Sequence, residues 1–283
     1  MQEVLPIMVF QTDFTYKEGA VAAMYGAVRS VSRDVEIVTA THEIPQYDIW
    51  SASYRLQQYV QFWPKGTVFV SVVDPGVGTS RKACVALTND GYYIVTPDNG
   101  ALTHIKAKHG IKEVREIDES INRLKQTEGT SVFHGRDLFG YCGARLASGI
   151  ITYEQVGNEY SVDDIVTLDI STPEGSEGYL KGIIEIDDPN FGNCWSNIPV
   201  AEMFENGFCY GDDVAITVTK DGKKLYDQIT RFGKTFGDVK KGEAILYNNE
   251  LMNVSLALSQ GSFMEQYKVY FGPEYIIEIR SVK

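Results

Sequence analysis

The sequence predicts an α/β domain with a mainly parallel sheet, followed by an all-β barrel domain. Strand-like and helix-like segments alternate from residue 6 to residue 71, and this β-α-β-α-β order is typical of a parallel sheet with crossover helices. Beyond residue 178 the chain changes to short strand-like runs separated by turn signals, which is typical of a barrel or sandwich. We expect residues 1–170 to form the α/β domain, 171–178 a polar linker and 179–283 the barrel.

The first domain starts with a predicted strand over 6–14 that ends in an aspartate. Apolar residues at helical spacing predict a helix over 17–32, and a β-branched run predicts a strand over 35–40. Aromatic and apolar residues mark the turns of a second helix over 48–62. The run 67–71 consists of β-branched, aromatic and small residues, so we expect it to be a buried strand at the centre of the sheet.

The remainder of the first domain mixes a hairpin with short elements. Asn89-Asp90-Gly91 is a strong hairpin signal between two strand-like runs. The further elements that we expect are strands over 82–88, 92–96 and 111–117, a polar loop over 120–131 and a helix over 138–148. In the second domain we expect strands over 179–186, 213–219, 225–232, 252–258 and 275–280, and one helix over 199–206.

Composition bounds the kind of partner and the compartment. The formal net charge of -12 argues against a nucleic-acid backbone or an anionic membrane surface as partner. The four cysteines form no Cys-x-x-Cys pair and stand in apolar or aromatic surroundings, so we expect reduced, buried thiols and a cytoplasmic protein. No apolar run approaches the roughly 18 residues that a membrane-spanning helix needs.

The loop after the central strand carries the strongest chemical signal. It places Asp74 at the strand's carboxyl end and Arg81 seven residues later, with Pro75, Gly76 and Gly78 between them. Glycines allow positive φ and a close approach to a ligand, and ligands of open α/β sheets bind at this edge. The alternative is an ordinary turn with a surface ion pair. The loop is neither a P-loop nor a dinucleotide fingerprint, because the required glycines and lysine are missing.

Further polar residues are expected along the same edge of the sheet: Asp13, Asp98 with Asn99, and His134. Each has a structural alternative, since the aspartates are also typical helix caps or turn formers and His134 could be a capping or core histidine. The four histidines do not have the spacing of metal ligands, so we expect no metal. The sequence has no Gly-x-Ser-x-Gly motif, so we do not expect a nucleophilic serine of that kind.

The segment 191–198 has an aromatic-Gly-Asn-x-aromatic pattern. It suits a planar ring held by stacking and by an amide, and it equally suits a turn between core strands. The residues alone therefore indicate a two-domain enzyme or binder for a small ligand, of aromatic or cationic character.

Five motifs carry the interpretation further: Thr12-Asp13-Phe14, Val72-Val73-Asp74-Pro75-Gly76-Val77-Gly78 with Arg81, Pro97-Asp98-Asn99-Gly100, Phe133-His134-Gly135-Arg136-Asp137, and Phe191-Gly192-Asn193-x-Trp195-Ser196-Asn197-Ile198. Together and in this order they resemble the S-adenosyl-L-methionine (SAM) hydroxide adenosyltransferase family, relatives of the bacterial fluorinase and chlorinase. The resemblance implies an α/β domain and a barrel, and a homotrimer with ligand between neighbouring subunits. It also implies that SAM is the substrate and that no cofactor takes part.

The activity that the resemblance implies is hydrolysis of SAM to adenosine and L-methionine, by attack of water or hydroxide at C5′ of the ribose. By family motif, Asp74, Arg81 and His134 are the residues that handle the water. Our hypothesis is that Arg81 stabilises hydroxide, that Asp74 orients Arg81 and His134, and that His134 accepts or relays the proton.

Substrate-binding residues follow from the same resemblance. Asp13 resembles the ligand of the ribose diol, Tyr47 stands beside the ribose, and Glu18 and Asp188 resemble ligands of the methionine ammonium group. The adenine wall corresponds to Phe191, Asn193 and Trp195. The family's Ser-Arg pair for the methionine carboxylate is replaced here by Glu250-Leu251, so either another cation such as Arg231 or a backbone nest serves, or this end of the substrate is held more weakly.

Two alternative functions stay open at this point. One is a halide adenosyltransferase of the chlorinase kind on the same fold, although Arg81 and His134 together favour the branch that uses water. The other is a protein that binds adenosine or SAM without catalysis.

Overall fold

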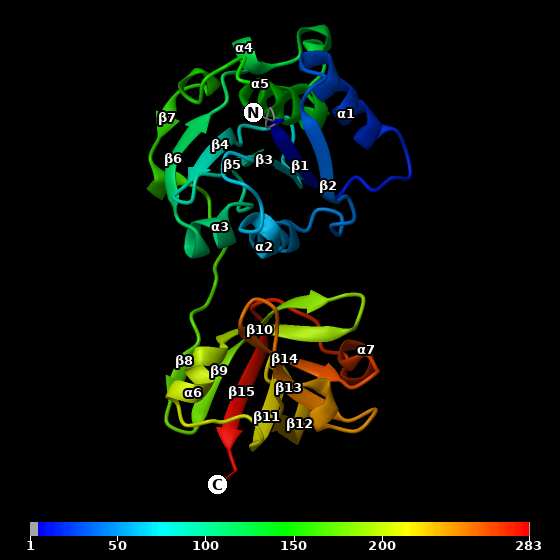
Figure 1. Cartoon of the computed structure of the whole chain (residues 1–283), viewed down its shortest axis with the longest axis vertical. Helices are drawn as coiled ribbons and strands as arrows, with labels where there is room; N and C mark the ends of the chain where they lie inside the picture. The colour runs from blue at the N-terminus through cyan, green and yellow to red at the C-terminus, as the bar shows by residue number, and fades with distance from the viewer. Residues whose placement is uncertain (1–4, 283) are drawn as a thin grey trace. The chain divides into compact units, whose positions relative to one another are not determined.

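The computed structural model describes residues 5–282 and divides into two compact units, which meet in the sequence between Leu168 and Asp169 (Figure 1). The first unit corresponds to the predicted α/β domain except for residues 169 and 170, which fall in the second unit together with the predicted barrel. Positions 1–4 and 283, which belong to the two predicted domains, lie outside the described residues.

The first unit is built on a seven-stranded sheet of order β2-β1-β3-β5-β4-β6-β7. Its strands are β1 (Ile7–Thr12), β2 (Glu36–Thr41), β3 (Val68–Val72), β4 (Ala83–Thr88), β5 (Tyr93–Pro97), β6 (Ile111–Glu116) and β7 (Glu159–Tyr160). The run β2-β1-β3-β5 is parallel throughout, and β6 runs in the same direction because it is antiparallel to β4, which is antiparallel to β5. The predicted, mainly parallel sheet is therefore confirmed.

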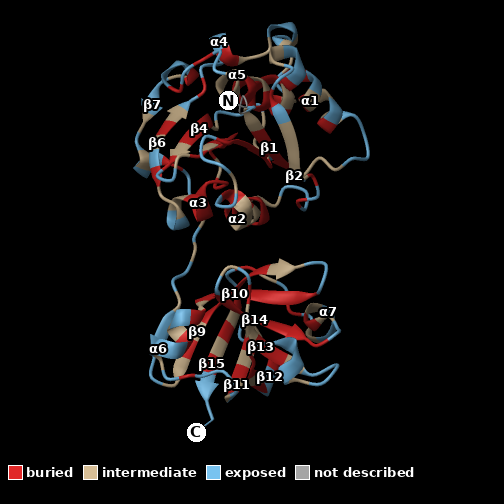
Figure 2. Ribbon diagram, viewed as in Figure 1, coloured by how far each residue is buried: buried red, intermediate tan, exposed pale blue. Residues whose placement is uncertain are grey.

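Helices cover both faces of this sheet, as Figure 1 shows. They are α1 (Ala20–Val31), α2 (Ile49–Val60), α3 (Thr103–Lys108), α4 (Glu119–Asn122) and α5 (Tyr141–Ala147). Side chains alternate along β1, so that Met8 and Phe10 pack in one core with α1 and α5, whereas Val9 packs in the other with α2 and α3. The central strand β3 is buried at every position, and burial on both faces explains why most of its residues are apolar (Figure 2).

Three elements of this unit differ from the sequence-based expectation. Helix α1 begins at Ala20 and not at residue 17, because the backbone turns through Thr15, whose φ is +57°. The predicted loop 120–131 contains the end of α4 and a 3-10 helix, Lys125–Thr127, and the buried Asn122 side chain anchors it by donating to the carbonyls of Gln155 and Val156. The predicted helix 138–148 begins within a π-helical segment, Gly135–Gly140, and only Tyr141–Ala147 forms the α-helix α5.

The second unit is a closed barrel, which confirms the predicted fold class. Its strands are β9 (Tyr179–Asp188), β10 (Asn193–Pro199), β11 (Asp213–Lys220), β12 (Lys223–Phe232), β13 (Ala244–Asn248), β14 (Asn253–Leu258) and β15 (Tyr275–Ser281), with helices α6 (Val200–Glu205) and α7 (Phe263–Tyr267). The sheet order β10-β14-β13-β12-β11-β15-β9 closes on itself because β10 also pairs with β9. Alternate residues of β11, such as Val214, Ile216 and Val218, lie in the barrel core.

The segment 171–178 differs from the expected linker. It belongs to the second unit, where β8 (Glu174–Ser176) pairs with the start of β9. Its polar and glycine-rich composition reflects an exposed edge hairpin. Strands β10 and β13 were not among the expected strands; β13 has only five residues, and the β10 segment could equally be a turn from its pattern.

The cysteines fit the expectation in three of four cases. Cys84, Cys142 and Cys194 are buried free thiols, whereas Cys209 is exposed, which corrects the expectation for that residue. Cys209 lies in the turn between α6 and β11, where its apolar neighbours in sequence do not enclose it. None of the helices within residues 5–282 has the length and apolar character needed to cross a membrane.

Candidate active site

Asp74 and Arg81 form a two-point ion pair at the carboxyl end of β3. Arg81 Nε donates to Asp74 Oδ1 over 2.9 Å, and its Nη2 donates to the other carboxylate oxygen. Both side chains are about nine-tenths buried. The loop returns the chain to this position through Gly78, whose φ is +77° and whose missing Cβ would lie 3.2 Å from the Ser131 carbonyl oxygen. This two-point contact fixes both the plane and the direction of the Arg81 guanidinium.

His134 completes this cluster from a different part of the chain. It stands at the start of the π-helical segment Gly135–Gly140, and its Nδ1 lies 2.9 Å from Nη2 of Arg81. A guanidinium can only donate, so Nδ1 is the acceptor and the ring proton of the neutral form is on Nε2. Hydrogen bonds thus link Asp74 to Arg81 and Arg81 to His134, and Asp74 acts on His134 through Arg81.

The imidazole of His134 is favoured in its neutral form. Burial and the positive charge of Arg81 lower the pKa of His134, and these effects outweigh the opposing charges of Glu119 and Asp74. A neutral imidazole can accept a proton, which a charged one cannot.

A cavity of about 620 Å³ in the first unit lies beside this cluster. Four predicted site residues line it: Asp13, Glu18, Tyr47 and Asp74. Arg81 and His134 are not part of its lining. Phe14, Phe133 and Arg136 complete much of the wall. The fold therefore gathers residues from the ends of β1 and β3 and from the loops after β2 and before α5 at one place, as expected for this edge of a parallel sheet.

Asp13 and Tyr47 are held together at this cavity. The Tyr47 backbone N–H donates to Asp13 Oδ2 over 2.9 Å, and Tyr47 adopts a left-handed conformation with φ of +68°. Burial raises the pKa of Asp13, the hydrogen bond from Tyr47 opposes that effect, and the charge of Asp74 adds to it. The carboxylates of Asp13 and Asp74, which line the same cavity, therefore interact electrostatically. The Tyr47 side chain is 63% exposed, so its ring is available to a ligand or a partner.

Glu18 is the third carboxylate of this cavity. It lies just before α1, and its Oε1 accepts from the backbone N–H of Ala20 over 2.9 Å. The helix N-terminus thus holds one oxygen of Glu18 in place.

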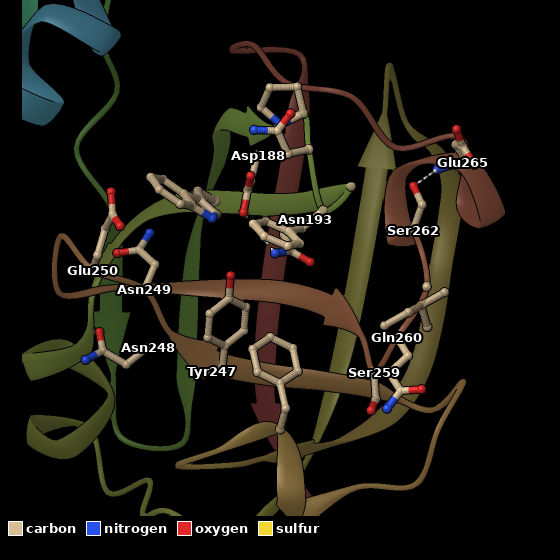
Figure 3. Close-up of a pocket in the computed structure, with 18 of the residues that line it drawn as sticks. Asp188, Asn193, Tyr247, Asn248, Asn249, Glu250, Ser259, Gln260, Ser262 and Glu265 are labelled. Carbon is tan, nitrogen blue, oxygen red and sulfur yellow. Dashed lines mark hydrogen bonds between the residues drawn. The ribbon is translucent and has the colours of Figure 1, made fainter. Parts of the chain in front are cut away.

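The second unit has its own cavity, of about 1090 Å³, lined by the other four predicted site residues: Asp188, Phe191, Asn193 and Trp195. Asn193 Nδ2 donates to Asp188 Oδ2 over 3.1 Å. Figure 3 shows Tyr247 of β13 with its hydroxyl directed toward Asn193 and Asp188. Burial raises the pKa of Tyr247 to about 12, and the charge of Asp188 adds to this effect.

The Phe191 side chain lies at the mouth of this cavity because of the glycine that follows. Gly192 has φ of +67°, and a Cβ there would lie 2.1 Å from Ser262 Oγ. Only glycine permits this close approach of the β9–β10 turn to the residue before α7. Phe191 is left 69% exposed beside the cavity, whereas Trp195 is almost fully buried in its wall.

Two residues considered from the sequence do not belong to either cavity. Asp98 accepts from the Tyr160 hydroxyl and from the Val166 backbone N–H, both over 2.9 Å, so its carboxylate anchors the segment after β7. Arg231, considered as a cation for the substrate carboxylate, pairs with Asp213 and donates to the Gly211 carbonyl. It lines neither cavity.

Sequence reasoning did not assign a role to Arg136, Arg123 or Tyr247. Arg136 is the one cation that lines the cavity of the first unit within the described residues, and it stacks over the ring of Phe133. Its place in the His-Gly-Arg-Asp motif was a signal that could have found it. Arg123 contacts His134 from a segment interpreted as a loop, and no pattern in the sequence indicates that contact. Within residues 5–282, no group of three or more His, Cys, Asp or Glu side chains could hold a metal ion.

The fold and these clusters define a two-unit protein, an α/β sheet joined to a barrel, with an Asp–Arg–His network beside a carboxylate-lined cavity. Residues 8–157 match the SAM hydroxide adenosyltransferase N-terminal domain, and residues 182–275 match the corresponding C-terminal domain. The chain belongs to the SAM hydroxide adenosyltransferase family.

Relatives cover almost the whole chain. It is 31% identical over 285 residues to the (R)-S-adenosyl-L-methionine hydrolase of Methanocaldococcus jannaschii, with 99% of this chain and 97% of that protein covered. A fluorinase of Nocardia brasiliensis is 28% identical, with 94% and 95% covered. The crystal structure of an uncharacterized conserved protein from Thermotoga maritima superposes with a TM-score of 0.88 at 30% identity, covering 96% of this chain and 99% of that one.

Proposed function

We propose that this protein hydrolyses SAM to adenosine and L-methionine, by attack of water or hydroxide at C5′ of the ribose as the sulfur departs. The observation that carries the proposal is the Asp74–Arg81–His134 network, with a buried guanidinium fixed between a carboxylate and a neutral imidazole. The leaving group is a sulfonium that becomes a neutral thioether, so the reaction requires neither a general acid nor a metal, and we propose that no cofactor takes part.

Each member of the network has a distinct task in this proposal. Arg81 stabilises the developing hydroxide, since a cation in a dry site lowers the energy of an anion beside it. Asp74 holds Arg81 in position through two hydrogen bonds. His134 accepts or relays the proton of the water, for which its lowered pKa provides the neutral form.

The cavity of the first unit is proposed to hold the ribose and the methionine end of SAM. Asp13 binds the two ribose hydroxyls, Tyr47 lies beside the ribose, and Glu18 binds the ammonium group. We further propose that Arg136 binds the methionine carboxylate, because it is the one cation among the described residues that line this cavity. Its Nε pairs with Asp137 over 2.5 Å, which leaves its Nη groups for a ligand.

The cavity of the second unit is proposed to bind adenine and to add a ligand for the ammonium group. Phe191 and Trp195 supply aromatic faces, Asn193 supplies an amide, and Asp188 supplies the carboxylate. We propose a homotrimer in which SAM lies between neighbouring subunits. The exposed rings of Tyr47 and Phe191 support this proposal, since large apolar side chains at a cavity mouth are typical of a surface that a ligand or partner covers.

A cytoplasmic location belongs to the same proposal. It is supported by the free thiols of Cys84, Cys142 and Cys194, which are buried and unpaired.

A halide adenosyltransferase is the second candidate function, because the relatives include fluorinases that align over 94% of the chain. The deciding experiment incubates the purified protein with SAM at high chloride, then at high fluoride, and separates the products by chromatography. Adenosine and methionine, lost in the Arg81→Ala variant, would establish hydrolysis. A 5′-halogenated adenosine would move the protein to the halide-using branch. Unchanged SAM together with thermal stabilisation would identify a binding protein without catalysis.

A further inference from the structure

Arg123 is a buried and fixed cation behind the proposed active site. It follows α4, and its side chain is only 10% exposed. Its Nη1 pairs with Glu119 Oε2 over 2.6 Å, one helical turn earlier, and its Nη2 donates to the carbonyl of Thr130. Because these two contacts hold the guanidinium from opposite ends, its charge has a defined position.

This guanidinium faces the side of His134 that Arg81 leaves uncovered. Arg123 Nη1 lies 3.5 Å from His134 Nε2, and Arg81 Nη2 lies 2.9 Å from His134 Nδ1. A neutral imidazole accepts at one nitrogen and donates at the other, and the shorter contact makes Nδ1 the acceptor. A protonated imidazole would present N–H groups to donors on both sides. The two guanidiniums, one on each side of the ring, therefore disfavour the protonated form.

The charges that surround His134 come from four residues on two segments, the loop that carries Asp74 and Arg81 and the helix α4 with the residue that follows it. Arg81 and Arg123 disfavour the imidazolium, whereas Glu119 and Asp74 favour it. Each carboxylate is paired with one of the guanidiniums, Asp74 with Arg81 and Glu119 with Arg123. Glu119 acts on the ring more strongly than Arg123 does, so the Arg123 charge offsets part of the Glu119 effect, and burial together with Arg81 keeps the pKa of His134 low.

We propose that Arg123 is a positioning residue whose charge favours the uncharged state of His134 from the side opposite Arg81, and that Glu119 opposes that effect. This role is electrostatic and does not depend on which substrate the protein uses. Its catalytic meaning rests on the proposed function: the uncharged ring is the form that can accept a proton from the attacking water.

A direct test measures the pKa of His134 by NMR titration of the imidazole resonances. The chain has four histidines, so the His134→Gln variant identifies the signal. Arg123→Gln is expected to raise the pKa of His134 by about one unit, a roughly tenfold change in its protonation equilibrium. Glu119→Gln is expected to lower the same pKa. Arg29→Gln is the matched control, since Arg29 donates to the carbonyls of Arg33 and Val35 and is not among the charged groups that face His134.

The test is specific because the pKa of His134 is expected to shift in opposite directions in Arg123→Gln and Glu119→Gln. Titration of His134 at the wild-type value in both variants, or a shift of both in one direction, would overturn the proposal. Arg123→Lys keeps the charge without the planar guanidinium, and it is measured if Arg123→Gln does not fold. A pKa of His134 that stays lowered in Arg123→Lys agrees with the proposal, whereas the loss of the lowering overturns it.

Activity separates this proposal from the proposed function. If SAM is hydrolysed, the acid limb of the pH profile of activity is expected to move to higher pH in Arg123→Gln and to lower pH in Glu119→Gln, in parallel with the pKa of His134 measured by NMR. NMR shifts of the expected signs in a protein that does not hydrolyse SAM would reject the proposed function and leave the role of Arg123 standing. Hydrolysis with an unmoved His134 titration would reject the role of Arg123 alone.

Discussion

The side-chain amide of Asn99 donates to the backbone carbonyl of Val73 over 3.0 Å. Val73 immediately precedes Asp74, so a residue at the end of the β4–β5 hairpin fixes the backbone that carries the proposed catalytic carboxylate. Asn99 itself is held by the Ala101 backbone N–H, which donates to its side-chain oxygen. The Pro-Asp-Asn-Gly motif thus supports the site from behind, although Asp98 and Asn99 do not line its cavity.

Replacement of Asn99 by alanine is expected to reduce the turnover of SAM by roughly tenfold, since a small displacement of a catalytic group is sufficient for losses of this order. Stability should fall by about 1–3 kcal/mol, because the carbonyl of the buried Val73 loses its partner. Asn206→Ala is the matched control, since it removes a comparable amide-to-carbonyl hydrogen bond in the second unit. Equal turnover in both variants would argue against support of Asp74 by Asn99.

Arg81 offers the sharpest separation of binding from chemistry. Arg81→Lys keeps a positive charge and loses the two-point contact with Asp74, so we expect turnover to fall roughly 10²- to 10³-fold. Binding of SAM, measured by thermal stabilisation, should persist, because Arg81 does not line the cavity. Arg280→Lys, at an exposed position of β15, controls for the chemistry of the replacement. Loss of binding together with turnover would mean that Arg81 acts on the substrate directly.

The sequence predicted the fold class and the order of most elements because periodicity and turn residues are local signals. Gly78, Gly91 and Gly192 all adopt positive φ at predicted turns. The assignments that failed depend on tertiary contacts. Arg123 stands in a polar segment whose composition predicts a loop, and only the return of the chain through His134 brings the imidazole next to it.

The same reasoning explains the other differences at the site. Asp98 has the composition of a site residue, and its carboxylate is taken up by Tyr160 and Val166, which lie more than sixty residues later. Arg231 is a cation in a strand, and the barrel register pairs it with Asp213 across β11 and β12. A residue's chemistry can be read from the sequence, whereas the contacts that occupy it depend on the topology.

Arg136 can be tested with a substrate analogue that lacks the group it is proposed to bind. Arg136→Gln is expected to raise the KM for SAM roughly 10- to 100-fold, the equivalent of one charge-assisted hydrogen bond. The KM for decarboxylated SAM should stay unchanged, since that molecule has no carboxylate. Equal effects on both substrates would remove Arg136 from carboxylate recognition. Thermal unfolding of the variant is a necessary control, because Arg136 is also the ion-pair partner of the fully buried Asp137.

His42 makes the first unit sensitive to acid without taking part in the proposed reaction. It is almost fully buried, and its ring lies 2.7 Å from Thr12 Oγ1 and 2.8 Å from the Tyr25 hydroxyl. Burial lowers its pKa to about 4. The unfolded chain binds a proton at His42 below about pH 6.5, whereas the folded chain does not until about pH 4, so acid favours unfolding.

The free energy of unfolding should therefore fall between pH 6.5 and pH 4 by on the order of 2–3 kcal/mol from this residue alone. Denaturant titrations at a series of pH values measure how steeply the free energy of unfolding depends on pH. His42→Gln should make this dependence weaker while lowering stability at pH 7. His109→Gln is the matched control, since His109 pairs with the half-exposed Asp90 at a hairpin turn. Because Thr12 immediately precedes Asp13, we also expect the loss of SAM binding to accompany the acid transition. An unchanged slope in His42→Gln would assign the acid sensitivity to other groups.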